Sequence, residues 1–412
     1  MALSEKISGH VVGPGGVKRA SRVLFYSHDT FGLGHLRRSR TIAAALTAAD
    51  EKMSALIITG SPVAGRFTFP ERVDYVRLPG VTKRSDGSYV SEKLCFDIEE
   101  TTVIRAGMIK SLVELFEPDI IVVDKEPTGF RGELRPALEW LRATGKSTKL
   151  VLGLRDILDS PELLAEEWDR KNAVQAIENY YHEIWVYGLK SVYDPTEGVK
   201  LSDEVRQRMI WTGYLRREPD RRAELPETPY VLVTPGGGGD GVAMVDQVLR
   251  AYEKDPELSP VALLVYGPFL VGDARAGFER RVADLNGRVI NVGFDSRMES
   301  LMAGALGVVA MGGYNTFCEI LSCDVPAVIV PRTVPRLEQY IRASRAQELG
   351  LVQMIDEKLN GDPVDAMINA IRNLPTQQPP SAGRYTGLLD GLECVVERTS
   401  ALLAQEPETK QA

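Results

Sequence analysis

The chain of 412 residues lacks the patterns that mark several common classes of protein. Its four cysteines, Cys95, Cys318, Cys323 and Cys394, form no CxxC pair, so we expect reduced thiols and no zinc site. No apolar run approaches the roughly 20 residues that span a bilayer, and residues 1–20 lack the apolar core of a signal peptide. The formal charge of −8 argues against a nucleic-acid partner. These features favour a cytoplasmic protein.

Three nucleotide-site or metal-site motifs are also missing. No DxD pair is present to hold a metal-bound diphosphate, so the sequence predicts no metal and no resident cofactor. No GK[ST] follows a glycine loop, which excludes a P-loop. The first glycine loop lacks the third glycine of a dinucleotide fingerprint, and no acidic residue ends the second strand, ALIITG. A dehydrogenase is therefore disfavoured.

Apolar strand-like runs alternate with helical segments along the whole chain, which predicts an α/β fold with parallel sheets. Helical periodicity covers residues 101–116, 132–144 and 165–181. Two similar halves each begin with a strand, a glycine-rich loop and a helix, so two doubly wound domains would hold a ligand between their sheet edges. We expect a disordered lead-in (1–20), an N-terminal domain (21–215), a charged linker (216–228), a C-terminal domain (229–380), a helix returning to the first domain (381–403) and a disordered tail (404–412).

The first glycine loop, SHDTFGLGHLRRSR, carries the candidate general base. Gly32 and Gly34 permit a tight turn after the first strand, and His35 opens the following helix. The positive end of the helix dipole favours a neutral imidazole, which can accept a proton. Asp124 ends the strand IIVVD and could orient His35 from a neighbouring strand, while Asp29 in the same loop is a competing partner. Local capping is the alternative for each of these residues.

The second glycine loop, TPGGGGDG, follows the strand YVLVT. Its successive glycines, Gly236, Gly237, Gly238 and Gly239, would allow close approach to a diphosphate. A flexible hinge is the alternative.

The most informative segment covers residues 308–351, where a buried strand runs into a glycine pair and a helix opens at once. Gly312, Gly313, Asn315 and Thr316 form this turn and helix start, whose main-chain N–H groups and hydroxyl could bind phosphate. Glu319 lies about a turn and a half into that helix, where its carboxylate could accept hydrogen bonds from a ribose diol.

Glu338 and Gln339 begin the next helix from the same sheet edge and could bind sugar hydroxyls. A plain polar helix face is the alternative. Together these parts predict a pocket for a nucleoside diphosphate that carries a sugar.

The text PGGGGDG, then VGFDSRMESLMAGALGVVAMGGYNTFCEILSCDVPAVIVP and LEQYIRA, resembles the donor domain of GT-B glycosyltransferases. It is most similar to the MurG-like group and its glycosyltransferase family 28 C-terminal domain. FGLGHLRRSRTIAAAL resembles the GxGH loop and helix of the acceptor-side domain. The whole chain resembles a bacterial branch of predicted glycosyltransferases. The resemblance implies a GT-B fold, in which two Rossmann-like doubly wound domains face each other across a cleft.

The resemblance implies nucleotide contacts for five residues. Phe294 matches the aromatic that caps uracil, and the backbone of Asp295 would bind the uracil edge. Gly313 and Thr316 match the diphosphate turn, and Glu319 matches the ribose carboxylate. UDP is therefore the expected nucleotide.

The resemblance also implies that Glu338 and Gln339 read the donor sugar and that His35 faces the acceptor. Glu338 stands where the family has glutamine, so N-acetylglucosamine does not follow as the sugar. Tyr314 and Asn315 replace small or apolar residues at the diphosphate turn.

We interpret the chain as a glycosyltransferase that moves a sugar from a nucleoside diphosphate to an acceptor hydroxyl, with inversion and without metal. The long polar loop at 78–94 is expected to choose the acceptor, be it a glycan, a lipid-linked sugar or a small molecule. A UDP-sugar 2-epimerase or hydrolase of the same fold, and a non-catalytic nucleotide-sugar-binding protein, stay open as alternatives. Peripheral contact with the inner face of a membrane also stays open, because Phe67 and Phe69 lie near arginines.

Overall fold

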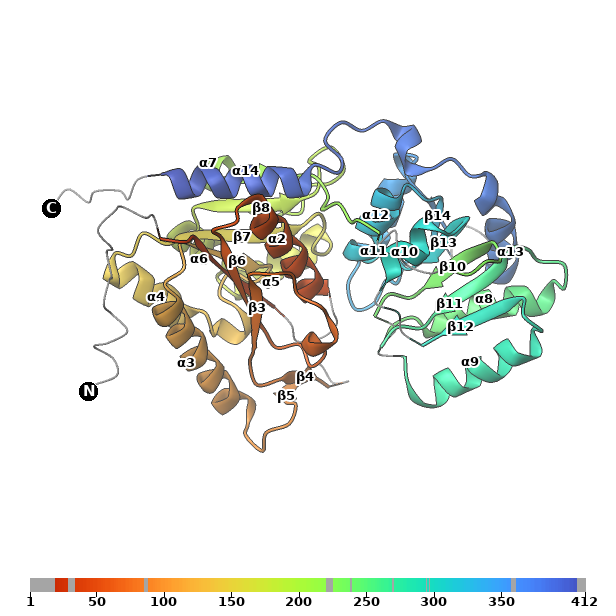
Figure 1. Cartoon of the computed structure of the whole chain (residues 1–412), viewed down its shortest axis with the longest axis horizontal. Coiled ribbons are helices and arrows are strands. Elements are labelled where there is room, and N and C mark those ends of the chain that lie inside the picture. The colour runs from red at the N-terminus through yellow and green to blue at the C-terminus, as the bar shows by residue number, and fades with distance from the viewer. Residues whose placement is uncertain are drawn as a thin grey trace.

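The computed structural model shows two lobes, each built on a parallel sheet with helices on its faces (Figure 1). Red to yellow-green segments form most of the N-terminal lobe, and green to blue segments form the C-terminal lobe, while the last blue helix lies on the N-terminal lobe (Figure 1). The structure describes residues 19–28, 34–84, 88–219, 225–237, 239–268, 270–293, 295, 297–356 and 361–405.

Within the described residues, the N-terminal sheet has seven strands that are all parallel to their neighbours. In spatial order they are β3 (Val73–Arg77), β2 (Ser54–Thr59), β1 (Arg22–Ser27), β6 (Ile120–Asp124), β7 (Lys149–Arg155), β8 (Glu183–Tyr187) and β9 (Met209–Trp211). The direction of winding reverses between β1 and β6, so the loops after these two strands diverge and leave a crevice at the sheet edge.

Helices cover both faces of this sheet because its central strands are buried on both sides. In β1, Val23 and Phe25 belong to the core on the α2 side, whereas Leu24 and Tyr26 belong to the core under α3 and α4. The helices of this lobe are α2 (Gly34–Ala49), α3 (Ile98–Phe116), α4 (Arg135–Thr144), α5 (Pro161–Arg170), α6 (Ala173–Tyr180) and α7 (Asp203–Gln207), with 3-10 turns η1 (Ala64–Arg66) and η2 (Phe130–Gly132).

The C-terminal sheet repeats this winding with six parallel strands among the described residues. In spatial order they are β12 (Val289–Val292), β11 (Val261–Val265), β10 (Tyr230–Thr234), β13 (Gly307–Ala310), β14 (Ala327–Ile329) and β15 (Gln353–Met354). Its helical segments are α8 (Val242–Lys254), α9 (Gly272–Asp284), α10 (Met298–Ala303), α11 (Tyr314–Cys323), α12 (Glu338–Glu348), α13 (Pro363–Asn373), η3 (Leu374–Thr376) and η4 (Pro380–Gly383). Its switch point lies between β10 and β13, where both expected phosphate turns begin.

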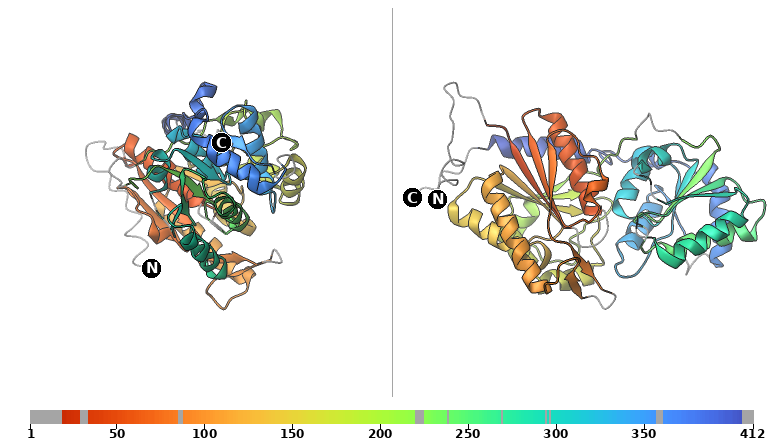
Figure 2. Two further views of the ribbon diagram at one scale, coloured as in Figure 1. Left: turned by 90° about the vertical axis from the view of Figure 1, so that its right-hand side faces the viewer. Right: turned by 60° about the horizontal axis from the view of Figure 1, so that its bottom comes forward.

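One hydrophobic core crosses between the lobes. It includes Leu36 of α2 and Phe317 of α11, so the helices that open the two candidate loops share a packed surface. The last helix, α14 (Gly391–Ala404), lies against α2 on the N-terminal lobe and adds Val395 to this core (Figures 1 and 2). The chain therefore crosses the lobe boundary twice.

The local structure differs from the sequence-based expectation in two places. The single helix predicted over 165–181 is two helices, α5 and α6, because Asn172 takes a left-handed conformation with φ of 53° between them. The segment 78–94, expected to be a loop, contains the antiparallel strands β4 (Val81–Lys83) and β5 (Tyr89–Ser91). Among the described residues, no helix combines the length and apolar character needed to cross a membrane.

Candidate active site at the lobe boundary

The imidazole of His35 lies against the carboxylate of Asp124. His35 is the second residue of α2, after β1, and Asp124 is the last residue of the neighbouring strand β6. The His35 Nδ1 and Asp124 Oδ2 atoms are 2.5 Å apart. A carboxylate at this distance requires the proton on Nδ1, which leaves the Nε2 lone pair of a neutral His35 able to accept a proton. Asp29 and Gly32, which also figured in the prediction, lie outside the described residues.

Arg38 is a further part of this site, to which the sequence-based prediction gave no role. Its guanidinium donates to both carboxylate oxygens of Asp124, at 2.7 and 2.6 Å from Nη2 and 3.0 Å from Nε. Arg38 is 1% exposed and Asp124 5%. Burial acts to raise the pKa of Asp124, but the charges of Arg38 and His35 outweigh it and hold that pKa well below its usual range. Asp124 therefore stays ionised beside His35.

His28, at the end of β1, packs edge-on against His35 with ring centroids 5.7 Å apart. Burial lowers the pKa of His28 to about 3, so this second imidazole is neutral and adds no charge beside His35.

The glycine loop after β10 lies where the prediction put it, at the edge of the C-terminal sheet. Gly236, with φ of +72°, Gly237 and Gly239 line the cleft, whereas Gly238 lies outside the described residues. Gly267, after β11, was not foreseen. A Cβ atom there would come within 2.3 Å of the Gly236 carbonyl oxygen, so only glycine lets the loop fold back at this point.

The second turn joins β13 to α11. Gly312 has φ of +77°, and a Cβ atom there would meet Ile329 at 2.7 Å, while a Cβ on Gly313 would meet open space. The first main-chain bond of α11 runs from Phe317 N to Gly313 O at 2.9 Å. The preceding N–H groups therefore have no partner within the helix and can bind an anion.

The side chains of Asn315 and Thr316 differ in their contacts. The Asn315 amide donates to the Gly34 carbonyl at 3.0 Å and accepts from Arg217 at 2.8 Å, so it ties this turn to the His35 loop. The Thr316 hydroxyl lies 3.9 Å from the position of a Cβ atom on Gly236, between the two glycine turns. The Asn315 amide is thus engaged at both ends in contacts within the protein, whereas Thr316 can offer both its main chain and its hydroxyl to a ligand.

Glu319 is 1% exposed and forms an ion pair with Arg37, which also bonds Glu299 at 2.9 Å. Arg37 belongs to α2, so this contact crosses the lobe boundary, and the sequence-based prediction did not include it. Burial raises the pKa of Glu319, although the charge of Arg37 acts in the opposite direction.

Asp295 lines the same cleft, and its carboxylate accepts from the Arg297 main chain at 2.7 Å. The predicted uracil cap, Phe294, lies outside the described residues.

Glu338 and Gln339 begin α12 and face the cleft. Glu338 is 3% exposed, and its Oε1 atom accepts from Arg332 at 2.9 Å. The Gln339 Oε1 atom accepts from the Arg332 main chain at 3.3 Å. Burial works against ionisation of Glu338, but Arg155, Arg332 and Arg342 lower its pKa. This carboxylate is therefore charged at neutral pH.

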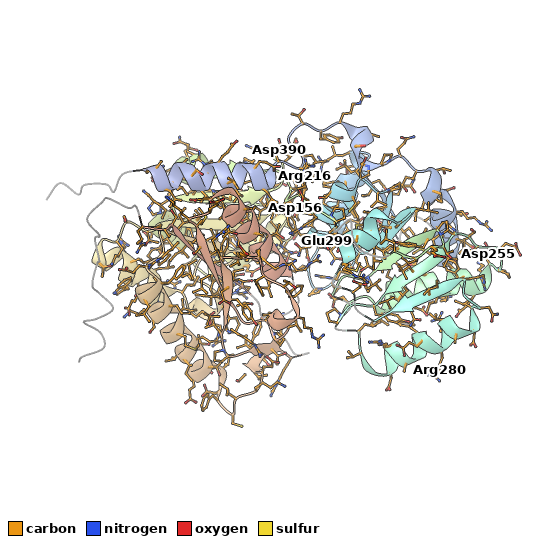
Figure 3. The ribbon with its side chains drawn as sticks, in the orientation of Figure 1. Asp156, Arg216, Asp255, Arg280, Glu299 and Asp390 are labelled. Carbon is orange, nitrogen blue, oxygen red and sulfur yellow. The ribbon has the colours of Figure 1, made fainter. Side chains whose placement is uncertain are left out.

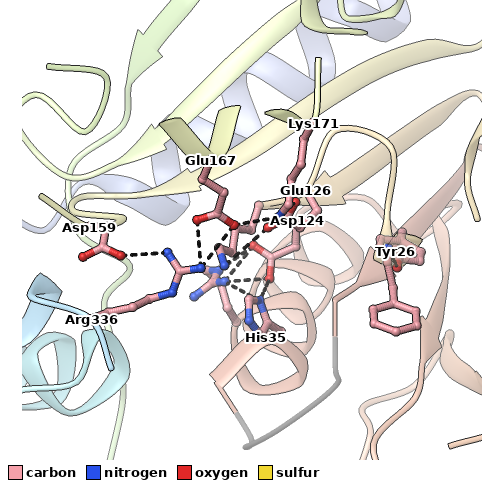
Figure 4. A network of polar contacts seen from close by, with 11 residues as sticks. Tyr26, His35, Asp124, Glu126, Asp159, Glu167, Lys171 and Arg336 are labelled. Carbon is pink, nitrogen blue, oxygen red and sulfur yellow. Dashed lines mark hydrogen bonds and ion pairs between the residues drawn. The ribbon is translucent and has the colours of Figure 1, made fainter. Parts of the chain in front are cut away.

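Ion pairs between the lobes hold α12 in place. Arg336 bonds Asp159 at 3.0 Å and Glu167 at 2.9 Å, close to the His35–Asp124 pair (Figure 4). Arg342 forms a bidentate ion pair with Asp156, with hydrogen bonds of 2.8 and 2.6 Å, and donates to the Gly312 carbonyl at 2.9 Å. Asp156 and Glu299 accordingly lie where the two lobes meet (Figure 3).

A single cleft of about 270 Å³ collects the predicted site residues from both lobes. Asp124 lies behind His35 and is not part of the lining. The predicted residues that line the cleft are Gly34, His35, Gly236, Gly237, Gly239, Asp295, Gly312, Gly313, Asn315, Thr316, Glu319, Glu338 and Gln339. The cleft also contains five arginines, Arg37, Arg38, Arg40, Arg155 and Arg332. The two glycine turns, which line this cleft, suit a diphosphate.

Two doubly wound domains that face each other across such a cleft define the GT-B glycosyltransferase fold. Residues 239–383 match the model of the glycosyltransferase family 28 C-terminal domain. No curated protein matches the chain.

Solved structures extend the likeness in fold to almost the whole chain. The calicheamicin glycosyltransferase CalG4 is 16% identical, with a TM-score of 0.59 over 94% of this chain and 99% of that one. MurG of Acinetobacter baumannii is 10% identical, with a TM-score of 0.56 over 92% and 99%. A UGT transferase from Siraitia grosvenorii in complex with UDP is 12% identical, with a TM-score of 0.60 over 93% and 100%.

Proposed function

We propose that the protein transfers a sugar from a nucleoside diphosphate, with UDP the expected nucleotide, to an acceptor hydroxyl. The observation that carries the proposal is the placement of His35, backed by Asp124, in the same cleft as the two glycine turns and Glu319. One lobe supplies a proton acceptor, and the other supplies groups suited to a diphosphate and a ribose. The match of residues 239–383 to a glycosyltransferase domain supports the same assignment.

Each of these groups has one role in the proposed reaction. The acceptor oxygen forms a bond to the anomeric carbon while the bond from that carbon to the diphosphate oxygen breaks, and the configuration inverts. His35 Nε2 takes the acceptor proton, a role worth about 10²–10⁴ in rate. Asp124 holds the imidazole and stabilises its charged form. The N–H groups around Gly313 and the Thr316 hydroxyl stabilise the charge on the leaving diphosphate.

The donor-side residues bind the rest of the nucleotide sugar. Glu319 accepts hydrogen bonds from the ribose hydroxyls, while Glu338 and Gln339 receive the sugar. The Asp295 main chain contributes to the base subsite.

A thermal-shift screen against UDP, GDP, TDP and ADP, each free and as its glucose conjugate, tests the donor site. A ligand that binds the folded protein raises its free energy of unfolding by about RT ln(1 + [L]/Kd), and the melting temperature rises as a result. We expect one nucleotide to stand out, and no shift with any of them would overturn the donor assignment.

A second assay tests the chemistry with the donor so identified. A glycosyltransferase releases nucleoside diphosphate only when an acceptor is supplied, whereas an epimerase or hydrolase converts the donor alone, and a binding protein converts nothing. His35→Gln should bind the donor as the wild type does but lose turnover. Normal turnover of this variant would show that another group takes the proton.

A further inference from the structure

Arg155 is the last residue of β7, beside β6, whose last residue, Asp124, pairs in register with Gly153. Its side chain lines the cleft, and its Nε atom is buried without a hydrogen-bond partner. The other arginines at the heart of the cleft form ion pairs: Arg37 with Glu299 and Glu319, Arg38 with Asp124, and Arg332 with Asp240 and Glu338. The Arg332 Nε atom also lacks a hydrogen bond, but it lies 3.0 Å from the Asp240 carboxylate. Within the described part of the chain, Arg155 has no such partner.

Glu338, in the opposite lobe, carries the opposite charge and also has a buried atom without a hydrogen-bond partner. Its Oε1 atom is bonded to Arg332, but its Oε2 atom is buried without a hydrogen-bond partner. Arg155 comes first among the charges that lower the pKa of Glu338, ahead of Arg332, although the two groups form no direct ion pair. Both side chains line the same cleft, Arg155 from the N-terminal lobe and Glu338 from the C-terminal lobe, and each has one buried atom without a hydrogen-bond partner.

A buried polar atom without a hydrogen-bond partner destabilises the protein. A ligand group that bonds both the Arg155 guanidinium and Glu338 Oε2 would therefore bind more tightly. A hydroxyl does this, because its oxygen accepts from the Arg155 guanidinium while its proton is donated to Glu338. A carboxylate or phosphate would satisfy Arg155 but would be repelled by Glu338, and an ammonium group would suffer the reverse. The chemistry of the pair therefore selects a neutral hydroxyl.

We propose that Arg155 and Glu338 form a two-sided clamp for a hydroxyl of the donor sugar, which makes Arg155 a specificity-determining residue supplied by the lobe that carries His35. The inference rests on the proposed function, because it takes the cleft to hold a nucleotide sugar. Arg155 contacts the sugar and not the nucleotide. Its contribution therefore appears only in the difference in affinity between a sugar conjugate and the free nucleoside diphosphate.

The test is calorimetric titration of the wild type and Arg155→Gln with UDP, GDP, TDP and ADP, with their glucose and galactose conjugates, and with UDP-glucuronate. For the nucleotide that binds, we expect Arg155→Gln to weaken the sugar conjugate by about 10-fold or more and to leave the free diphosphate unchanged. Arg155→Lys keeps the charge but loses the planar set of N–H donors, so its affinity for the sugar conjugate should lie between those of the wild type and Arg155→Gln. Arg40→Gln removes a positive charge from the same cleft without facing Glu338, and it should leave the ratio of the two affinities at its wild-type value.

A double-mutant cycle with Glu338→Gln gives the coupling. If both residues hold one hydroxyl, the loss in the double variant is smaller than the product of the two single losses. Equal weakening of conjugate and free diphosphate by Arg155→Gln would mean that Arg155 acts through lobe closure, and it would overturn the clamp. A preference for UDP-glucuronate that Arg155→Gln abolishes would overturn it as well. Absence of any nucleotide binding to the wild type would overturn the proposed function itself.

Discussion

Replacing Asp124 by asparagine, alone and together with a substitution of Arg38, separates the structural role of Asp124 from its proposed catalytic role. The substitution keeps the shape of the side chain but removes the negative charge that faces Arg38, which is 1% exposed. Breaking a buried ion pair from one side costs about 3–5 kcal/mol, because the remaining charge is left uncompensated. We expect a loss near 3 kcal/mol, since the amide oxygen still accepts one hydrogen bond from Arg38.

The double variant Arg38→Gln/Asp124→Asn removes both charges together. It should recover most of the lost stability, because no uncompensated charge remains in the core. It should not recover turnover, because His35 still lacks the carboxylate that fixes its tautomer and stabilises its charged form. The two variants therefore differ in stability and agree in their loss of activity.

Urea unfolding followed by circular dichroism measures the first effect, and release of nucleoside diphosphate measures the second. An exposed pair, Arg131 with Glu99, provides a matched control, since Glu99→Gln should change stability by less than about 1 kcal/mol. An unchanged urea midpoint for Asp124→Asn would refute the ion-pair reasoning. Full turnover in the double variant would show that Asp124 serves stability alone.

Three further results are expected. Glu319→Gln should weaken binding of the free nucleoside diphosphate by about 10-fold or more in calorimetry. The substitution removes a charged acceptor for the ribose hydroxyls and breaks the ion pair with Arg37. An affinity equal to that of the wild type would place the ribose elsewhere. Gly267→Ala should abolish donor binding while the lobes stay folded, as judged by circular dichroism, because its Cβ would strike the Gly236 carbonyl; normal binding would show that the loop can shift. Burial acts to raise the pKa of Glu126, but the charges of Lys125 and Lys171 outweigh it and lower that pKa from 4.5 to about 2. Glu126 therefore stabilises the fold above pH 4.5, and this contribution is lost as the pH falls toward 2. Glu126→Gln should flatten that part of the curve of stability against pH, and an unchanged acid limb would contradict the assignment.

The sequence locates those candidate site residues that lie at the end of a recognisable strand. Asp124 and Gly312 each follow or end a short apolar run, and in a parallel sheet such positions collect at one edge. The contact of Asp124 with His35 follows from the strand order, since β1 and β6 are neighbours in space and far apart in the chain. No local pattern encodes that order.

Contacts that cross between the lobes could not be read from the sequence for the same reason. Arg37 and Glu319 are 282 residues apart along the chain, and each alone is an ordinary charged residue on a helix. The available signal was the adjacent arginine pair directly after a glycine loop, at a helix end that would otherwise repel positive charge. Such a pair implies acidic partners near that helix end, although it does not say which ones.

The first turns of α2 connect the two chemical roles of the cleft. Successive helix residues point about 100° apart, so Arg38 reaches back to Asp124 in its own lobe while Arg37 reaches across to Glu319. His35 precedes both arginines in the first turn of the same helix. A ribose that binds at Glu319 would compete for this carboxylate with Arg37, which lies on the helix of the proposed base.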